Sequence, residues 1–596
     1  MALSDPSPET TLQTQVCVIG SGPAGIACAL ELARRRIDVI LVEAGGTDHL
    51  PEAQAMCDAE IVDPRRHAPM HDAVRRALGG TSWLWGGRCL PFDPIDFEPR
   101  DHVPDVGWPV SYAEIAPWYR IACEYANCGR PTFTLAELEA PSARQPLTNT
   151  FQPGAVIASD LERWSGEPNF ARRYAEALRT SPHVRLLLDA TCVAIDLMPG
   201  SEQIRSVGVV TGLCGDTRLR IRADRYVLAC GGLESTRLLL NANLQHNDQL
   251  GNRGGMLGCH YMGHVSGKIA SVRLHADPAR TVWHFERDAQ GFYARRRLTV
   301  PAEMQHRHGL LNTAMWLDNP PLADPRHGNG LLSMAYLALR TPGLSRLLAA
   351  PAIARLTTAG GPPDALTAHL RNVARALPKI AAFVPPFAYR HYLARPRLPG
   401  FMLQSPTNLY ALHYHAEQLP HRASRVTLAD SADRHGMRRL KVDLRFQRAD
   451  AESVVRGHAL LDRHLRDTGA GQLDYWTPAS ERVDAVLAIA ADGFHQIGTA
   501  RMAADWRRGV VNRDCRVFGT RNLYVASSAV FPTSSQANPT LTILALAARL
   551  AHHLAMQLEN NQPGRGLAGD DGRLADATAG NGNMPMAART AGGAMP

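Results

Sequence analysis

Two residues near the C-terminal end have the chemical types and the setting of a site for acid–base chemistry. His495 lies in the stretch HQIGTARM, and Asn538 is followed by Pro539 and by a helix-forming run from Thr540 to Leu558. An Asn and a Pro directly before a helix predict an N-cap with proline at the first helical position. An imidazole base, a carboxamide and the positive end of a helix dipole together predict removal of a proton and a hydride from an alcohol.

Removal of a hydride needs an acceptor, and the N-terminal region predicts where one binds. Residues 15–46 read QVCVIGSGPAGIACALELARRRIDVILVEAGG. This pattern predicts a short apolar strand, a glycine-rich turn, a helix and a second strand, which we expect at 16–19, 20–25, 26–35 and 38–42. Such an arrangement holds the pyrophosphate of a dinucleotide at the start of a helix.

The residues of this turn have separate expected roles. Gly20 allows the tight turn, Gly22 lets backbone N–H groups approach a pyrophosphate, and Gly25 lets the helix pack closely on the strand. Glu43 follows the turn by about twenty residues, at the place where a carboxylate hydrogen-bonds a ribose hydroxyl. The motif does not separate FAD from NAD, because both contain adenosine diphosphate.

A third block, Gly79 to Pro91, reads GGTSWLWGGRCLP. Two glycine pairs around small hydroxyl and Trp residues suit a loop that lies against a large planar ligand, although an ordinary turn has the same composition. Taken with the two terminal blocks, it resembles the glucose-methanol-choline (GMC) family of flavin-dependent oxidoreductases, nearest the pyranose and glycoside oxidoreductase branch. Three further segments, GWPVSYAEIAPWY, VLACGGLESTRLLL and AEQLPHRASRVTL, match that family in order, so the resemblance spans roughly residues 15–558.

The resemblance implies a catalytic pair and a non-covalent FAD. His495 takes the proton of the alcohol, Asn538 orients the hydroxyl, and the helix at Thr540 stabilises the reduced flavin. Leu84 stands where some relatives have a histidine bonded covalently to the flavin, and Ser527 stands where many have Asp near the ribityl chain. The expected FAD contacts are Gly20, Gly22, Pro23, Ala24, Gly25, Glu43, Ala44, Gly80, Thr81, Ser82, Gly86, Gly87, Val193, Ala229, Ser527, Ser528, Pro539 and Thr540.

The same resemblance leaves the substrate open. A sugar, glycoside or polyol is the first hypothesis, and a lipid or secondary-metabolite alcohol is the second. A third is a lyase-type reaction, in which the histidine acts as a base without net oxidation. The motifs do not say whether oxygen, a quinone or a protein accepts the electrons.

The expected fold is α/β, with a discontinuous Rossmann-type FAD domain and a substrate domain built on a mostly antiparallel sheet with helices. A chain of 596 residues is too long for one core, which also predicts two or more domains. Strand pairs are expected within 184–197 and within 416–428. We expect the FAD domain at 1–100, 180–265 and 490–558, connecting segments at 101–180, the substrate domain at 265–490, and a disordered tail at 559–596.

Composition predicts a globular protein of a reducing compartment, with the cytoplasm as the default. The first fifteen residues have neither a basic start nor an apolar run, and no apolar stretch approaches eighteen residues, so neither a signal peptide nor a transmembrane helix is expected. Eleven cysteines without metal-type CxxC pairs fit free thiols. The net charge of +8 comes with the Arg-rich usage of a GC-rich bacterial genome and with no nucleic-acid-binding motif.

Two further features have more than one interpretation. Between Leu337 and Gly400 the single acidic residue is Asp364, among nine basic ones. One interpretation is a helical lid with arginines on its solvent-exposed face. The other is a basic amphipathic surface that binds a membrane, a quinone, or an acidic or lipid-linked substrate. His413 and His415, on an alternating strand, are candidates to line the substrate cavity; without a third ligand, no metal site is expected.

Overall fold

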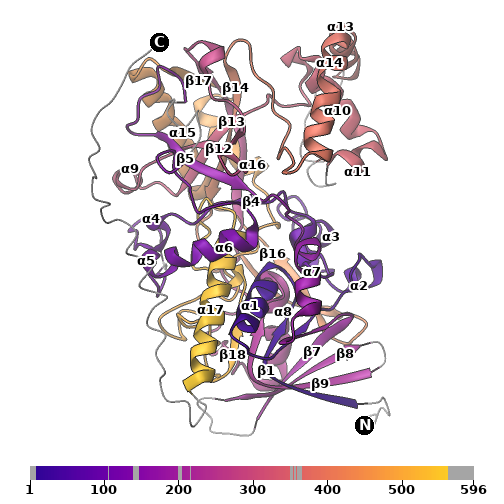
Figure 1. The fold of residues 1–596 in the computed structure, drawn as a ribbon. Coiled ribbons are helices and arrows are strands. Elements are labelled where there is room, and N and C mark those ends of the chain that lie inside the picture. The colour runs from indigo at the N-terminus through magenta and orange to yellow at the C-terminus, as the bar shows by residue number, and fades with distance from the viewer. Residues whose placement is uncertain are drawn as a thin grey trace, which may run out of the picture.

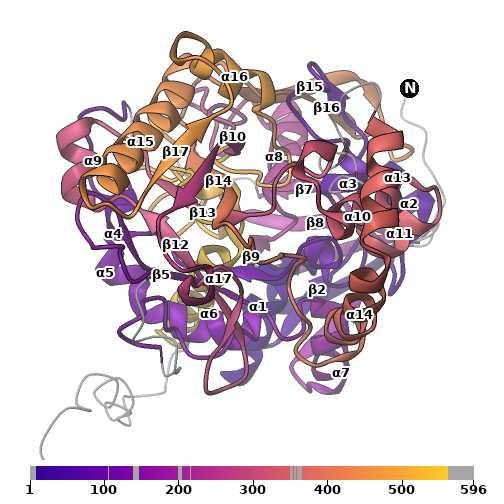
Figure 2. The same ribbon diagram turned by 90° about the horizontal axis from the view of Figure 1, so that it is seen from above.

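Two large β-sheets and a lobe of helices make up the molecule, which the computed structural model shows in Figures 1 and 2. The structure describes residues 9–104, 107–138, 147–198, 205–214, 217–349 and 365–560, together with Ala354 and Thr358. The tail that we expect to be disordered lies outside the described residues from position 561 onward.

The first sheet is a mainly parallel layer of the Rossmann type. Its strands follow the order β6-β2-β1-β9-β8-β7, with β18 beside β9. β1 runs parallel to β2 and β9, and β18 runs parallel to β9, so the carboxyl ends of these strands meet at one edge, where open α/β sheets bind ligands. The strands span Glu9–Ile19 (β1), Val39–Val42 (β2), Val184–Leu187 (β6), Ala190–Leu197 (β7), Val207–Cys214 (β8), Thr217–Leu228 (β9) and Leu523–Val525 (β18).

The predicted strand, turn and helix are present as β1 and α1 (Pro23–Arg34). Residues 16–19 are all buried, as expected of a central strand that is covered on both faces. β1 begins at Glu9, well before the predicted strand, because residues 9–14 continue the pairing with β9. Since five of the six residues of this extension are polar, the apolar run alone does not mark the start of the strand.

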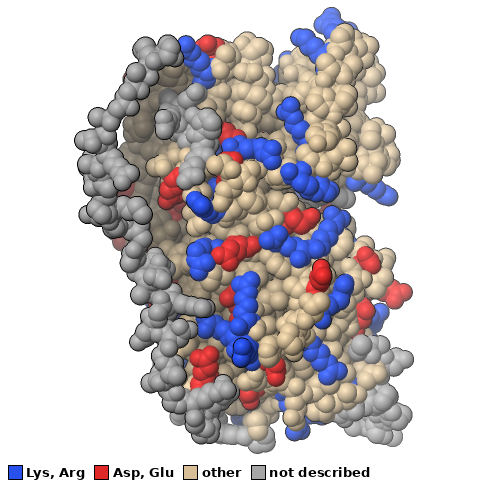
Figure 3. Space-filling model, in the orientation of Figure 1, with Lys and Arg blue, Asp and Glu red and all other residues tan. Residues whose placement is uncertain are grey.

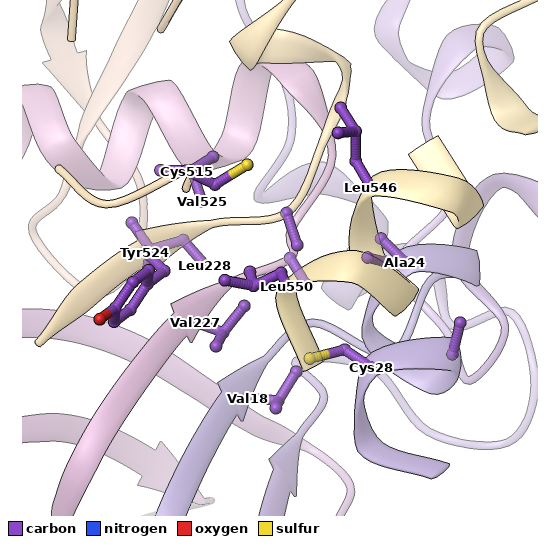
Figure 4. Packing of buried hydrophobic residues seen from close by; sticks show 14 of the residues in the cluster. Val18, Ala24, Cys28, Val227, Leu228, Cys515, Tyr524, Val525, Leu546 and Leu550 are labelled. Atoms are coloured by element: carbon purple, nitrogen blue, oxygen red, sulfur yellow. The ribbon is translucent and has the colours of Figure 1, made fainter. Parts of the chain in front are cut away.

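Helix α17 (Thr540–Asn560) packs on α1, on the sheet and on α6 (Tyr119–Ala126). Figure 4 shows its Leu550 beside Val227 and Leu228 of β9. Among the described residues, α17 alone is long and apolar enough to cross a membrane, and 67% of that window is buried inside the protein. Its apolar surface is therefore used in the core.

The second sheet is antiparallel throughout and follows the order β17-β10-β14-β13-β12-β5-β4, with β11 beside β12. Helix α15 (Arg448–Asp467) covers it through a second apolar core. β5 comes from the segment 101–180, which is expected to connect the domains, and β4 comes from the segment 1–100, which is expected in the FAD domain; both add to this sheet. The strands span Arg88–Cys89 (β4), Ile157–Trp164 (β5), His264–Leu274 (β10), Glu286–Arg287 (β11), Tyr293–Thr299 (β12), Thr313–Asp318 (β13), Leu409–Glu417 (β14) and Gly471–Tyr475 (β17).

Two predicted strand pairs are wrong. β6 and β7 do not pair with each other, because β6 joins β2 and β7 joins β8. β14 and β15 (Arg425–Ala432) lie in different sheets, since β15 pairs with β16 (Arg438–Asp443), which also joins β3 (Glu60–Ile61). Neighbouring strands look the same in a sequence whether they pair with each other or with distant partners.

The helical lobe consists of α10 (Gly330–Arg340), α11 (Leu344–Leu348), α13 (Ala365–Arg375), α14 (Leu377–Ala388) and the short π-helix η6 (Tyr389–Leu393). Figures 1 and 2 show it as a separate group of helices beside the second sheet. A small apolar core that includes Leu322, Leu332 and Tyr336 anchors it. The remaining helices include α2 (Pro51–Ala55), α3 (Met70–Ala73), α4 (Pro94–Phe97), α5 (Tyr112–Ile115), α7 (Phe170–Thr180), α8 (Gly232–His246), α9 (Ala302–His308) and α16 (Arg482–Ile489).

A substitution at Gly25 tests the close packing of α1 on β1. A Cβ at this position would lie 1.8 Å from the carbonyl oxygen of Gly20, which is backbone and cannot move aside easily. We expect Gly25→Ala to lower the free energy of unfolding by about 3 kcal/mol, measured by urea denaturation. Gly457→Ala is the matched control, because nothing lies within 4 Å of a Cβ there and alanine favours the helix α15. Equal stability of the two variants would contradict this packing.

Candidate functional site

A cavity of about 690 Å³ lies at the carboxyl edge of the first sheet. The three blocks singled out in the sequence meet around it, although they are far apart along the chain. The first contributes the turn at 20–24, the second contributes residues 80–86, and the third contributes residues 526–528 and 538–540. The start of α1 and the start of α17 both open into this space, so two positive helix ends face it.

Most of the predicted contact residues line this cavity. They are Gly20, Gly22, Pro23, Ala24, Glu43, Ala44, Gly80, Thr81, Ser82, Gly86, Ala229, Ser527, Ser528, Pro539 and Thr540, together with His495 and Asn538.

Three predicted contacts do not line it, for separate reasons. Gly25 faces Gly20 and serves the helix–strand packing. Gly87 faces Pro168 and Ser165. Val193 lies at a β-bulge between Cys192 and Ala194, and the residues of β7 that line the cavity are Ala190, Thr191 and Cys192.

His495 and Asn538 are in direct contact at the wall of the cavity. Nδ2 of Asn538 lies 2.9 Å from Nε2 of His495, and both residues are partly exposed to the cavity. The Oδ1 atom of Asn538 is buried and has no hydrogen-bond partner among the described residues. The predicted N-cap role is therefore wrong: α17 begins at Thr540, and the Asn538 side chain is directed to the imidazole instead.

Two buried residues lie behind His495. Its Nδ1 atom is 2.9 Å from Nδ1 of His264 and 3.3 Å from a carboxylate oxygen of Asp492. Burial opposes ionisation of Asp492, but the neighbouring His495 and His264 outweigh it and hold the carboxyl pKa well below its usual range. Burial also lowers the pKa of His264, so that ring is neutral. A neutral ring and a full negative charge thus face the back of His495.

The hydrogen bonds of His264 decide which nitrogen of His495 carries the proton. Nε2 of His264 lies 3.2 Å from the carbonyl oxygen of Ser534, to which it can only donate. Its Nδ1 is then an acceptor and takes the Nδ1–H of His495. The Nε2 of His495 is left with a lone pair toward the cavity, where the Asn538 amide donates to it. This is the form of imidazole that accepts a proton from a bound hydroxyl.

One ring nitrogen each of His264, His415 and His495 lies within 4.8 Å of the other two. The sequence did not indicate that His264 and His495 are neighbours of His415. His415 stacks on His264 at 4.2 Å, and its Nδ1 bonds the carbonyl of Gln536 at 2.7 Å. Both nitrogens of His264 already have hydrogen-bond partners. We therefore interpret the trio as a hydrogen-bonded pair, His264 and His495, with the ring of His415 stacked on His264.

His413 lies apart from the reactive pair. It stacks on Trp316 at 4.4 Å and contacts Ser266 and Asp318. Arg88, which does line the cavity, covers the ring of Trp316 at 4.4 Å and pairs with Glu162 at 2.5 Å. His413 thus packs on Trp316 behind the cavity wall, and Arg88 is the residue of this group that lines the cavity.

Residues 93–108, which follow the Gly79 to Pro91 block in the sequence, hold the loop that carries Asn538. The Ser535 hydroxyl donates to Asp96 at 2.6 Å, and the Gln536 amide donates to Asp93 at 2.8 Å. The indole of Trp108 donates to Thr533 at 2.9 Å. These bonds place Asn538 opposite His495 through partners about 430 residues away in sequence, which local patterns cannot indicate.

The residues around the cavity fit an FAD molecule. An added Cβ at Gly22 would meet nothing within 4 Å, so the backbone at the start of α1 is open to a pyrophosphate. Glu43 accepts three hydrogen bonds, two from Ser21 and one from Gly45, which leaves one carboxylate oxygen with room for a ribose hydroxyl. Leu84 and Trp85 offer apolar surface for a flat ring near His495.

Sequence patterns missed Asp492, His264 and Arg88. Asp492 lies three residues before His495, a spacing that gives a signal only when the loop geometry is known. His264 begins β10, more than two hundred residues upstream, and no motif surrounds it. Arg88 lies in the glycine-rich block, but its approach to the second sheet is a tertiary contact.

Comparisons with known proteins agree with this site. Residues 15–399 match the family model described as FAD dependent oxidoreductase, and residues 420–547 match that of the GMC oxidoreductase C-terminal region. A 6'''-hydroxyparomomycin C oxidase of Streptomyces lividus is 24% identical over 91% of each chain. A paromamine 6'-oxidase of Streptomyces fradiae is 23% identical, also over 91% of each chain.

Solved structures share the fold at low sequence identity. Formate oxidase from Aspergillus oryzae gives a TM-score of 0.52 at 16% identity, covering 94% of this chain and 100% of its own. Pyridoxine 4-oxidase from Mesorbium loti gives 0.50 at 16% identity, covering 91% and 99%. With both family models matched in order and most of the predicted FAD contacts lining one cavity, the chain belongs to the FAD dependent oxidoreductases and carries the C-terminal domain of the GMC oxidoreductases.

Proposed function

We propose that the protein oxidises the CH–OH group of a sugar, glycoside or polyol to a ketone or aldehyde. The observation that carries this is the His495–Asn538 pair, which presents a lone pair and an amide to the cavity at the start of α17. Bound FAD would supply the hydride acceptor. The residues that would hold it are those at the starts of α1 and α17 and in the loop at 80–86.

The protein's own groups account for the movement of the proton. The substrate hydroxyl displaces the Asn538 amide from Nε2 of His495 and gives its proton to that nitrogen. The Nδ1–H then stays between His264 and the charged Asp492, which stabilises the imidazolium at 3.3 Å. Asn538 donates to the oxygen as negative charge develops there.

The proposed substrate class is supported by two relatives whose names refer to aminoglycoside oxidation. Over a shorter stretch of 138 residues, a C-glycoside 3-oxidase of Microbacterium trichothecenolyticum is 34% identical. The alternative substrates are a lipid or secondary-metabolite alcohol, and the alternative reaction is a lyase-type cleavage with His495 as the base.

The proposal extends to the setting of the enzyme. We place it in the cytoplasm of a bacterium, which agrees with the ten described cysteines being free. Its FAD is bound non-covalently, because Leu84 offers no atom for a bond to the flavin. Oxygen, a quinone or a protein takes the electrons.

Anaerobic mixing of the FAD-loaded protein with sugars, polyols and long-chain alcohols tests the reaction. Oxidation bleaches the flavin absorbance. We expect His495→Ala to slow bleaching by about 10³-fold and Asn538→Ala by about 10²-fold, because one loses the base and the other a donor to the oxygen. Substrate turnover without bleaching would support the lyase instead and contradict oxidation.

Asp492→Asn tests the charge behind the base. Without the carboxylate the imidazolium is less stable, so we expect bleaching to slow about 10- to 100-fold. The acid limb of the pH–rate profile should move to lower pH, because the charge that stabilises the imidazolium is then absent.

Asp450→Asn is the matched control for that variant. Asp450 is as buried as Asp492, and burial outweighs its backbone hydrogen bonds and raises its pKa to about 7, but it lies on α15 away from the cavity. Its pH–rate profile should match that of the wild type. If Asp492→Asn also leaves the profile in place, the carboxylate does not act on His495.

Gly22→Ala tests the expected position of the pyrophosphate. The backbone at Gly22 has φ of −69°, which alanine adopts freely, and the added methyl meets no protein atom within 4 Å. We therefore expect unchanged thermal stability of the FAD-free protein but at least tenfold weaker FAD binding, measured by flavin fluorescence.

Acid precipitation of the wild type should leave all flavin in the supernatant; a yellow pellet would contradict non-covalent binding.

A further inference from the structure

The helical lobe concentrates the charge of the whole chain. Residues 337–400 contain nine basic residues and one acidic residue, a net charge of +8. The net charge of all 596 residues is also +8, so the rest of the chain is balanced. In Figure 3 the lobe, at the upper right, shows basic side chains and no acidic ones on the side in view, whereas both signs are mixed elsewhere.

The same lobe exposes large apolar side chains. Eight of the seventeen exposed large hydrophobic residues of the described chain lie in it. Their exposed fractions reach 74% for Leu347 and 71% for Leu393. The eight are Leu344, Leu347, Leu366, Leu370, Leu377, Val384, Tyr389 and Leu393.

Helix α14 shows the pattern most clearly. Its sequence LPKIAAFVPPFA contains one charged residue, Lys379, and no residue of this described helix is buried. Phe383 and Phe387 lean on Phe401, at ring-centroid distances of 6.0 and 5.4 Å, and hold the helix to the lobe. The remaining apolar surface of α14 faces outward. A soluble helical lid would bury this surface and turn its arginines to water, so the lid interpretation fails for α14.

Exposed leucines next to exposed arginines and lysine suit one kind of partner. An anionic bilayer takes apolar side chains into its acyl boundary and attracts basic residues with its surface potential. A nucleic acid would use the charge but not the leucines, and an apolar protein groove would use the leucines but not a charge of +8. We propose that the helical lobe docks the protein on the surface of a membrane that contains anionic lipids.

The position of the lobe determines which edge of the cavity would lie near the membrane. Figures 1 and 2 place the lobe on the side of the molecule where α2 and α3 lie. His71 and Asp72 of α3 line the cavity. A docked lobe would therefore hold that edge of the cavity close to the bilayer.

Vesicle flotation of the FAD-loaded, full-length protein tests the proposal. We expect binding to phosphatidylcholine vesicles that contain phosphatidylglycerol, little binding to pure phosphatidylcholine, and release as salt screens the charges. Leu377→Glu should weaken binding at least tenfold, since a charge replaces an inserted leucine. Leu244→Glu is the matched control, because both leucines are 58% exposed but Leu244 lies on α8.

The basic residues are tested in the same way. Arg371→Gln with Arg375→Gln removes two charges from α13 and should weaken binding about tenfold or more. Arg218→Gln with Arg222→Gln removes two exposed charges from β9 and should have no effect. Flavin content should stay equal in all four proteins, which shows that the variants fold.

Two outcomes would overturn the proposal. One is the absence of binding to anionic vesicles, or equal loss of binding in the lobe variants and in their controls. The other is self-association, seen by light scattering, that Leu377→Glu abolishes in a protein that does not bind vesicles; a second copy would then cover the lobe. Neither readout requires that an alcohol bleach the flavin, so failure of the proposed reaction would leave this test intact.

Discussion

The buried carboxylate of Asp492 is the interaction on which the rest of the site depends. It accepts the backbone N–H of His264 at 2.7 Å and those of Phe494 and His495 at 2.9 and 3.2 Å. It therefore ties the first residue of β10, in the second sheet, to the loop that carries the base. A buried charge is stable only when its hydrogen bonds are satisfied, and here the satisfied bonds fix the geometry of the site.

The two sheets have different parts in this arrangement. The first supplies helix ends at its carboxyl edge, where backbone N–H groups and positive dipole ends gather. The second supplies Arg88, which lines the cavity, and the neutral ring of His415, which lies behind the cavity wall. The base and the amide lie between them, on loops 492–498 and 533–538, which are held from both sides. Chemistry at a domain boundary thus uses rigidity that neither sheet provides alone.

Apolar helices occur in two settings in this chain, one in the core and one exposed in the helical lobe. Helix α17 has the length and hydropathy of a membrane span, yet it lies in the core against α1. Helix α14 is shorter and also apolar, yet it buries none of its residues. Both helices are mainly apolar. The difference is whether the rest of the chain packs against the helix: a helix with packing partners is part of the core, and a helix without them leaves an exposed apolar surface.

The sequence by itself determined the dinucleotide turn, the loop at Gly79 to Pro91, the pair His495 and Asn538, and the charge of residues 337–400. Each depends on local rules: glycine conformations, helix starts, and the chemical identity of a side chain. It erred on the pairing of β6, β7, β14 and β15 and on the N-cap role of Asn538. Tertiary structure alone decided that Asp492 and His264 lie behind the base, because their contacts join segments whose separation in sequence carries no pattern. It also decided that the leucines of α14 face outward, since exposure depends on what the rest of the chain places beside them.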